Sequence, residues 1–180
     1  MKQKIEEKVI IPEGVNCEYK EGTFYCRSDS LESSKKIIIP EVSLEIKNNE
    51  VILSCNKANK GKRKVIISFK KHIENMFNGM KDKYVYKIEA CNVHFPMSLK
   101  IEGNKLLISN FLGEKVARIA KILPGVDAQL KGTSITLTSH NKEAAGQTAS
   151  NMEKATMVRN RDRRVFQDGL FITEKPGDKK

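Results

Sequence analysis

The sequence predicts an α+β fold in which two small duplicated domains follow one another, each a mainly antiparallel sheet packed against one helix. Three observations support this prediction: an internal repeat, a β-hairpin at the same place in each copy, and an amphipathic helix after each hairpin. We expect the first repeat at residues 1–82 and the second at residues 83–158. A basic C-terminal extension at residues 159–180 is expected to pack on the second repeat.

Two stretches of the chain align without a gap up to the residues before each helix. They are PEVSLEIKNNEVILSCNK at 40–57 and PGVDAQLKGTSITLTSHNK at 124–142. In both, apolar and polar residues alternate on either side of a short turn, which is typical of half-buried strands. The turns contain Asn48-Asn49 and Gly132-Thr133. Because Asn and Gly tolerate the positive φ angles of tight turns, each copy is predicted to contain a β-hairpin.

Helical spacing follows each hairpin. In the first copy the apolar stripe consists of Ile66, Phe69, Ile73, Met76, Phe77 and Met80. In the second copy the inward face consists of Ala145, Thr148, Ala149, Met152 and Ala155, with Asn141 as the expected N-cap. Since stripes at this spacing are typical of core-facing helices, we assign both to the hydrophobic core.

Another pair of short strands precedes each hairpin, at residues 11–28 and 97–111, with turns at Lys20-Glu21-Gly22 and Gly103-Asn104. Linking strands are expected at Lys36–Ile39 and Lys115–Ala120, and the strand that opens the second repeat at Tyr84–Cys91.

The charge of the chain favours a polyanionic partner. Lys and Arg number 33 against 22 Asp and Glu, which gives a formal net charge of +11. Such an excess is most often associated with nucleic acid, although charge alone would also allow a membrane surface. No apolar run is long enough to span a bilayer, and the N-terminal MKQKIEEK does not resemble a signal peptide. We therefore expect a cytoplasmic protein.

Catalytic, metal and cofactor sites find little support. The histidines, His72, His94 and His140, show no metal-ligand spacing, and no Gly-rich phosphate loop is present. The cysteines, Cys17, Cys26, Cys55 and Cys91, stand singly without a Cys-x-x-Cys pair. We expect no enzyme, no metal and no cofactor. An RNA-processing enzyme that uses His94 or His140 is a remote alternative.

The densest basic cluster lies near the C-terminus, where Lys154 precedes Arg159, Arg161, Arg163 and Arg164. Arginine grips phosphate with a planar fork, so this cluster is the better candidate for specific contacts. Asp162 and Asp168 are expected to orient its arginines. From the residues alone, a solvated tail is an equally good interpretation. The lysine-rich residues 57–87 would give general attraction or only a solvated helix face.

Two further segments could contact phosphate. His140, Asn141 and Lys142 begin the second helix, where free amide groups could bind an anion or simply be capped. The loop at 110–115 offers Gly113 for a tight bend and Lys115 for charge.

Three stretches carry a resemblance to a known family: VHFPM at 93–97, NFLGEK at 110–115 and DRRVFQDGLFITEK at 162–175. They resemble large-ribosomal-subunit protein six in its archaeal and eukaryotic form. The resemblance implies binding to large-subunit ribosomal RNA through the second domain and the C-terminal segment, close to the sarcin–ricin loop where translation factors dock. The matching positions are Gly113, Glu114, Lys115, Arg163, Arg164, Phe166, Asp168, Gly169 and Lys175.

We therefore expect a structural constituent of the large ribosomal subunit, with ribosomal RNA and neighbouring ribosomal proteins as partners and translation factors as indirect ones. A free-standing RNA-binding or chaperone protein is the alternative. The expected RNA-binding residues are Lys115, His140, Asn141, Lys142, Lys154, Arg159, Arg161, Arg163, Arg164 and Lys175. The expected structural anchors are Gly113, Phe166, Asp168, Gly169 and Phe171.

Overall fold

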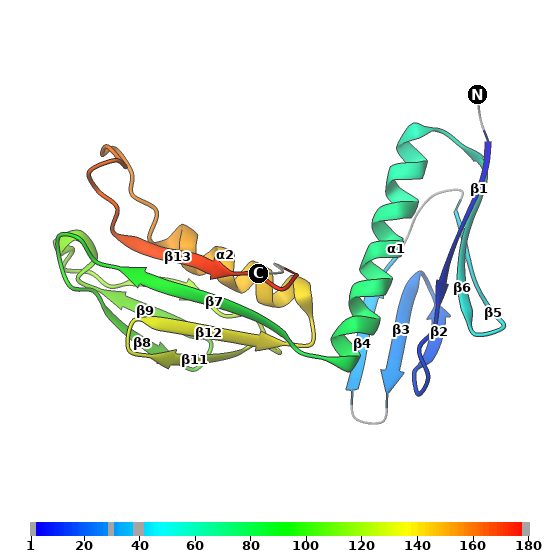
Figure 1. The fold of residues 1–180 in the computed structure, drawn as a ribbon, viewed down its shortest axis with the longest axis horizontal. Coiled ribbons are helices and arrows are strands. Elements are labelled where there is room, and N and C mark those ends of the chain that lie inside the picture. Colours follow the sequence, from blue (N-terminus) through cyan, green and yellow to red (C-terminus); the bar gives the residue numbers. More distant parts are fainter. Residues whose placement is uncertain (1–2, 29–30, 38–41, 178–180) are drawn as a thin grey trace. The chain divides into compact units, whose positions relative to one another are not determined.

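The computed structural model describes residues 3–28, 31–37 and 42–177. The chain divides into two compact units, Met1–Asp82 and Lys83–Lys180. In the described residues each unit contains antiparallel strands in two sheets together with one α-helix (Figure 1). The predicted α+β fold with two repeated sheet-and-helix domains is therefore confirmed.

The first unit builds its core between two three-stranded sheets and one helix. Its elements are β1 (Gln3–Ile10), β2 (Asn16–Lys20), β3 (Thr23–Ser28), β4 (Leu31–Lys36), β5 (Ser43–Lys47), β6 (Glu50–Ala58) and α1 (Lys60–Lys81). The strand orders are β1-β6-β5 and β2-β3-β4. Phe24, Leu53, Ile66 and Ile73 are fully buried in the core that these elements enclose.

The second unit repeats this plan and adds a strand. Its elements are β7 (Tyr84–Cys91), β8 (Ser98–Glu102), β9 (Lys105–Ser109), the 3₁₀ turn η1 (Phe111–Gly113), β10 (Arg118–Lys121), β11 (Asp127–Lys131), β12 (Ser134–Ser139), α2 (Lys142–Ala155) and β13 (Gly169–Glu174). The strand orders are β10-β9-β8 and β11-β12-β7-β13. The added strand, β13, runs antiparallel to β7 at the sheet edge, with Leu170 opposite Ala90.

The hairpin turns have the backbone geometry that their sequences predict. Asn48 and Asn49 have φ angles of 49° and 62°, and Gly132 has 60°. The turn between β2 and β3 likewise places Glu21 and Gly22 at positive φ, at 49° and 74°. These angles match the right-handed twist of the flanking strands, which is why Asn and Gly are found there.

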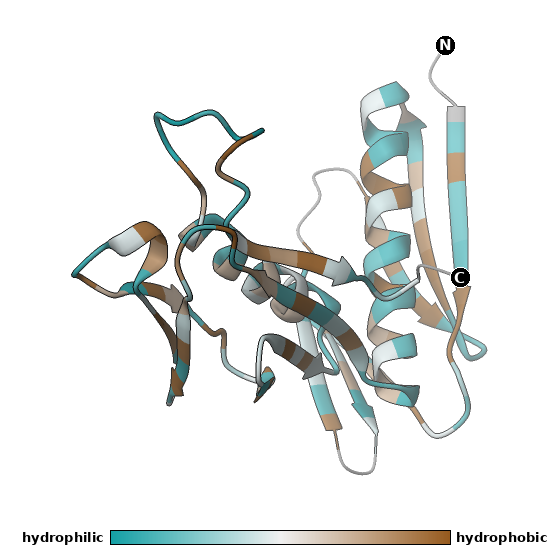
Figure 2. Ribbon diagram, turned by 60° about the vertical axis from the view of Figure 1, so that its left-hand side comes forward, coloured by the Kyte–Doolittle hydropathy of each residue, from teal (hydrophilic) through white to brown (hydrophobic). Residues whose placement is uncertain are grey.

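Both helices bury the faces expected from their spacing. On α1 the buried side chains are Ile66, Ile73 and Phe77, with Phe69, Met76 and Met80 partly buried beside them. On α2 they are Ala145, Thr148, Ala149 and Met152. Hydrophobic and hydrophilic residues recur along α1 at helical spacing (Figure 2). Small residues on α2 let it pack closely on the sheet, and a Cβ at Gly146 would lie only 2.9 Å from the Tyr86 hydroxyl.

The sequence patterns did not predict β1. Its inward positions are Ile5 and Glu7, which are half-buried, and Val9, which is buried, so a carboxylate interrupts the apolar alternation. Glu7 is paired with Lys70 of α1, whose Nζ lies 2.7 Å from Glu7 Oε2. Lys70 is therefore a partner of the first sheet and not simply part of a solvated lysine face.

Two linking strands begin at other residues than expected. They are Leu31–Lys36 and Arg118–Lys121, in place of the predicted Lys36–Ile39 and Lys115–Ala120. Residues 38–41, part of the first prediction, lie outside the described residues. In β4 the half-buried positions are Leu31, Ser33 and Lys35. Because two of these side chains are polar, the sequence shows no apolar alternation there.

Two cysteines that stand singly in the sequence are neighbours in the fold. Cys17 and Cys26 lie directly opposite each other on β2 and β3, and their Sγ atoms are 3.7 Å apart. The hydrogen bond with Cys17 and the burial of Cys26 both raise the pKa of the Cys26 thiol. Cys26 is therefore a neutral core residue.

Candidate nucleic-acid interface

The segment between α2 and β13 is tied to the loop after β7 by a buried carboxylate. Asp168 is 2% exposed. Its Oδ1 accepts the backbone N–H of Val93 at 2.8 Å and of His94 at 2.9 Å, and its Oδ2 lies 2.6 Å from His94 Nδ1. Asp168 therefore holds His94 and the following loop, and not an arginine as the sequence suggested.

The ionisation of Asp168 assigns the proton on His94. Burial alone would raise the pKa of Asp168, but hydrogen bonds from the His94 and Val93 backbones and from the His94 ring outweigh burial and hold the pKa at about 2. Because the carboxylate carries no proton at neutral pH, His94 Nδ1 must be the donor. The His94 ring is therefore fixed by its Nδ1 contact with Asp168.

An aromatic stack extends from this buried pair. The rings of His94 and Phe166 are stacked, with centroids 4.7 Å apart and planes 20° from parallel. The guanidinium carbon of Arg161 lies 4.8 Å from the Phe166 centroid. Arg161 is thus held against the protein by a cation–π contact. Sequence reasoning considered His94 only as a remote catalytic candidate, because its partner Asp168 is distant in sequence.

Arg163 and Arg164, the next basic residues of the tail, differ in their partners. Arg164 donates to Asp162 through Nη2 at 2.8 Å and through Nε at 3.2 Å, which agrees with the orienting role expected of Asp162. Hydrogen bonds from Val165 and Phe166 to the Asp162 carbonyl close a turn there. Arg163 projects from the same turn, but its side chain has no hydrogen bond or ion pair with the described residues.

Arg118 clamps the loop at 110–117 to the end of α2, and sequence reasoning did not single it out. It pairs bidentately with Glu114, at 2.6 and 2.8 Å, and donates through Nη1 to the carbonyl of Ala155 at 2.9 Å. Its guanidinium carbon also lies 4.2 Å from the centre of the Phe111 ring. Glu114, which the family resemblance indicated, therefore orients Arg118. The four-residue spacing of Glu114 and Arg118 was the one sequence signal that could have indicated this ion pair.

The loop itself has an unusual backbone. Asn110, Leu112 and Gly113 all have positive φ angles, of 60°, 49° and 79°. The side-chain amide of Asn110 donates to the Pro96 carbonyl at 3.0 Å. A strained backbone of this kind is kept where the surrounding contacts fix it, and it places Lys115 on the exposed side of the loop.

The start of α2 is occupied by its own cap. Asn141 Oδ1 accepts the N–H groups of Glu143 at 2.9 Å and Ala144 at 3.2 Å. Lys142 Nζ lies 5.6 Å from the centre of the Tyr84 ring. Asn141 is therefore the N-cap, as expected, and contact of His140, Asn141 and Lys142 with RNA stays a prediction.

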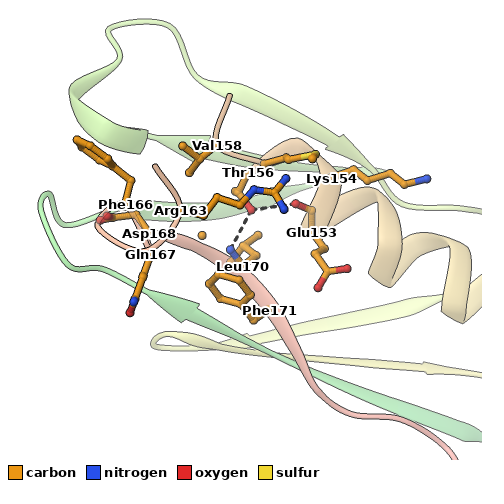
Figure 3. A pocket seen from close by; sticks show the side chains of 12 residues that line it. Glu153, Lys154, Thr156, Val158, Arg163, Phe166, Gln167, Asp168, Leu170 and Phe171 are labelled. Carbon is orange, nitrogen blue, oxygen red and sulfur yellow. Dashed lines mark hydrogen bonds between the residues drawn. The ribbon is translucent and has the colours of Figure 1, made fainter. Parts of the chain in front are cut away.

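Three expected RNA-binding residues come together around the end of α2. Lys154 and Arg163 line a groove of about 520 Å³ (Figure 3), and Lys154 and Arg159 line an adjoining hollow of about 350 Å³. We call Lys154, Arg159 and Arg163 the cationic cluster. The side chains of these residues make no hydrogen bond or ion pair with the described residues. Lys115, His140 and Lys175 line neither of these hollows.

The tail is anchored by Leu170 and not by the expected Phe171. Phe171 is 45% exposed, whereas Leu170 is 1% exposed and lies in the core of the second unit. The N–H of Leu170 donates to the buried Thr156 Oγ1 at 2.9 Å. Gly169 has a φ of 157°, a conformation that favours glycine. Leu170, together with Thr156, replaces Phe171 as the anchor.

Within the part of the chain that the structure describes, no group of three or more His, Cys, Asp or Glu side chains is placed to hold a metal ion. No helix among the described residues is long and apolar enough to cross a membrane.

The sequence is similar to proteins of one known family. The family profile described as "Ribosomal protein L6" matches residues 95–169. The chain is similar to large ribosomal subunit protein uL6 of Methanococcus vannielii, with 35% identity over 173 residues, which covers 96% of this chain and 95% of the relative. It is also similar to uL6 of Methanosarcina mazei, with 34% identity over 175 residues, which covers 97% and 99%.

Proposed function

The chain belongs to the ribosomal protein L6 family, and from this premise we propose that it binds ribosomal RNA mainly through its second unit and C-terminal extension. Its place is in the large ribosomal subunit, as a structural component and not an enzyme. We place its contact with RNA near the region where translation factors dock, with neighbouring ribosomal proteins as further partners and translation factors as indirect ones.

The cationic cluster carries this proposal. Arg161 and Arg164 are committed to Phe166 and Asp162, whereas Lys154, Arg159 and Arg163 have no partner among the described residues. Three such cations within one pair of adjoining hollows create a local positive potential on a chain of net charge +11. The arginine forks would grip phosphate oxygens and fix the orientation of the protein on folded RNA.

The fixed scaffold around the cluster supports shape recognition. Asp168 ties β13 to the loop after β7, and Arg118 ties the loop at 110–117 to the end of α2. Because these contacts order the segments before RNA arrives, little conformational entropy is lost on binding. Such preordering suits recognition of folded RNA by its shape and backbone.

A matched pair of triple variants tests the proposal. Lys154→Ala/Arg159→Ala/Arg163→Ala should weaken binding to large-subunit ribosomal RNA at least about tenfold, because each lost contact is a charge-assisted hydrogen bond. Lys60→Ala/Arg63→Ala/Lys64→Ala removes the same charge from the exposed surface of α1 and should weaken binding much less. Affinities would be measured by filter binding at one salt concentration.

Equal losses in the two triple variants would move the interface to the first unit. Co-sedimentation gives an independent outcome. The protein should stay with the large subunit in high salt, whereas release into the supernatant would favour a free-standing RNA-binding protein or chaperone. Nucleotides crosslinked to the protein should fall near the sarcin–ricin loop, and crosslinks confined to other regions would contradict the placement near the factor-docking region.

A further inference from the structure

The groove of about 520 Å³ has apolar side chains in its lining, which a surface that binds only phosphate does not need. It lies between the end of α2 and the tail segment that leads into β13 (Figure 3). Its volume falls within the range of about 300–1,000 Å³ that is usual for small-ligand sites. Its apolar lining comes from Met157, Val158, Phe166, Leu170 and Phe171.

Two large apolar side chains in this groove are exposed to solvent. Met157 is 46% exposed and Phe171 is 45% exposed. One comes from the segment after α2 and the other from β13, so the fold brings them to one groove from separate elements. Apolar side chains gathered at a concave site indicate a ligand with an apolar face.

The polar groups of the groove are arranged for a ligand that also carries negative charge. Arg163 and Lys154 line it without partners among the described residues, and Figure 3 shows them coming from the tail segment and from α2 respectively. Asp168 also lines the groove, but its carboxylate is occupied by Val93 and His94 and its side chain is 0% exposed. Glu153 is then the one acidic lining residue whose carboxylate the described contacts leave open.

A hydrogen-bonding side chain completes the site. Gln167 lines the groove, and its Nε2 donates to the Arg164 carbonyl at 3.0 Å. That bond fixes the amide and uses one of its two N–H donors, so the second donor and the amide oxygen remain for a ligand. An amide that offers one donor and one acceptor side by side is suited to the edge of a nucleobase.

We propose that this groove binds one unstacked nucleobase of ribosomal RNA, with the base against the Phe171 ring and Met157, and with Arg163 and Lys154 on its flanking phosphates. The inference rests on the proposed function and names the contact that this site makes. A flat apolar face flanked by phosphates matches an apolar groove with cations along it. Splayed-out bases that stack on aromatic side chains are the usual target of specific RNA recognition.

Three variants of the full chain test the ring. Phe171→Leu should lower affinity for large-subunit ribosomal RNA about tenfold, since stacking of a base on an aromatic ring is lost. Phe171→Tyr keeps the ring face and should bind like the original chain. Phe95→Leu is the matched control, because Phe95 is equally exposed at 47% in the same unit but does not line the groove.

Zero-length ultraviolet crosslinking of the same complex locates the base. Mass spectrometry should find the nucleotide adduct on Met157 or on the peptide that contains Phe166 and Phe171. The melting temperature of each variant, which should stay within a few degrees of the original, separates loss of contact from loss of fold. Phe171 is exposed, so its replacement by Leu leaves the core intact.

The outcomes separate this inference from the proposed function. If the unmodified chain does not bind ribosomal RNA, the proposed function itself fails. If it binds but Phe171→Leu behaves like Phe95→Leu, or the adduct lies elsewhere, the groove is not a base site while RNA binding stands. A crosslink from a neighbouring protein's peptide to the groove would also overturn the base assignment.

Discussion

At the scale of single residues, the buried pair of Asp168 and His94 does most to order the candidate interface. One carboxylate accepts two backbone N–H groups and one ring N–H, and the fixed His94 ring then supports Phe166. Since each of these hydrogen bonds involves a charge in a dry site, they are stronger than neutral ones. A single residue thus positions both the loop after β7 and the aromatic stack.

The pKa of Asp168 gives a pH-dependent prediction. Its pKa is about 2 in the folded chain and about 3.9 in an unfolded chain, so its stabilisation is complete above about pH 4 and is lost as the pH falls through about 2. Asp168→Asn should lower the free energy of unfolding of the second unit by roughly 2 kcal/mol at pH 7. The difference from the original chain should shrink between pH 4 and pH 2 in urea unfolding experiments.

Asp162→Asn is the control for this measurement. Asp162 is also an acid in a hydrogen-bonded pair, but its side chain is 47% exposed and its partner Arg164 is 90% exposed, so it should change stability little. A destabilisation of Asp168→Asn that is the same at pH 7 and pH 2.5 would contradict the assignment of an ionised carboxylate.

At the scale of elements, the end of α2 is the point to which the second unit ties its loops. Arg118 on β10 bonds to the Ala155 carbonyl and to Glu114, and Thr156 bonds to Leu170 on β13. Orphan carbonyl groups at the end of the helix are thereby satisfied by a cation, which also interacts favourably with the helix dipole. Lys154 of the cationic cluster therefore lies on a helix end that several contacts hold in place.

Arg118→Lys tests this clamp. Lysine keeps the charge but cannot pair bidentately with Glu114, reach the Ala155 carbonyl and lie flat on Phe111 together, so the second unit should lose about 1–3 kcal/mol of stability. Arg159→Lys makes the same chemical change at a side chain without partners and should stay within about 0.5 kcal/mol. Thermal unfolding measures both, and equal effects would exclude the clamp.

At the scale of the whole molecule, two units of one plan have diverged. In the second unit, the four-stranded sheet has β13 at its edge, next to β7. In the described residues of the first unit, no strand lies beyond β1, the counterpart of β7. The added strand and the segment before it contain Arg163 and Phe171 and form one wall of the groove. Divergence of this kind agrees with RNA contact concentrated in the second unit.

Much of the fold follows from local sequence patterns, because strands and helices of a duplicated domain repeat the same periodicity. The hairpins at Asn48-Asn49 and Gly132-Thr133 are of this kind. The sequence did not predict β1 because Glu7 occupies an inward position in it. The ion pair with Lys70 that compensates this charge is visible only in the folded chain. Patterns of one segment do not report a partner that lies far away in the chain.

The candidate interface was predictable as a segment but not as an arrangement. The arginine-rich tail is visible in the sequence, yet its residues divide into Arg161 and Arg164 with internal partners and Arg159 and Arg163 without them. The contacts of Asp168 with His94 and of Arg118 with Ala155 join residues that are 74 and 37 positions apart. Such long-range pairs have no local signal.

The central claim, that the cationic cluster binds RNA phosphates, is tested most directly by the salt dependence of binding. A plot of log affinity against log salt concentration has a slope that counts the phosphates neutralised. The Lys154/Arg159/Arg163 triple alanine variant should show a slope shallower by about 2–3 than the original chain, while the Lys60/Arg63/Lys64 variant should keep it. An unchanged slope in the first variant, or an equal loss in both, would contradict the claim.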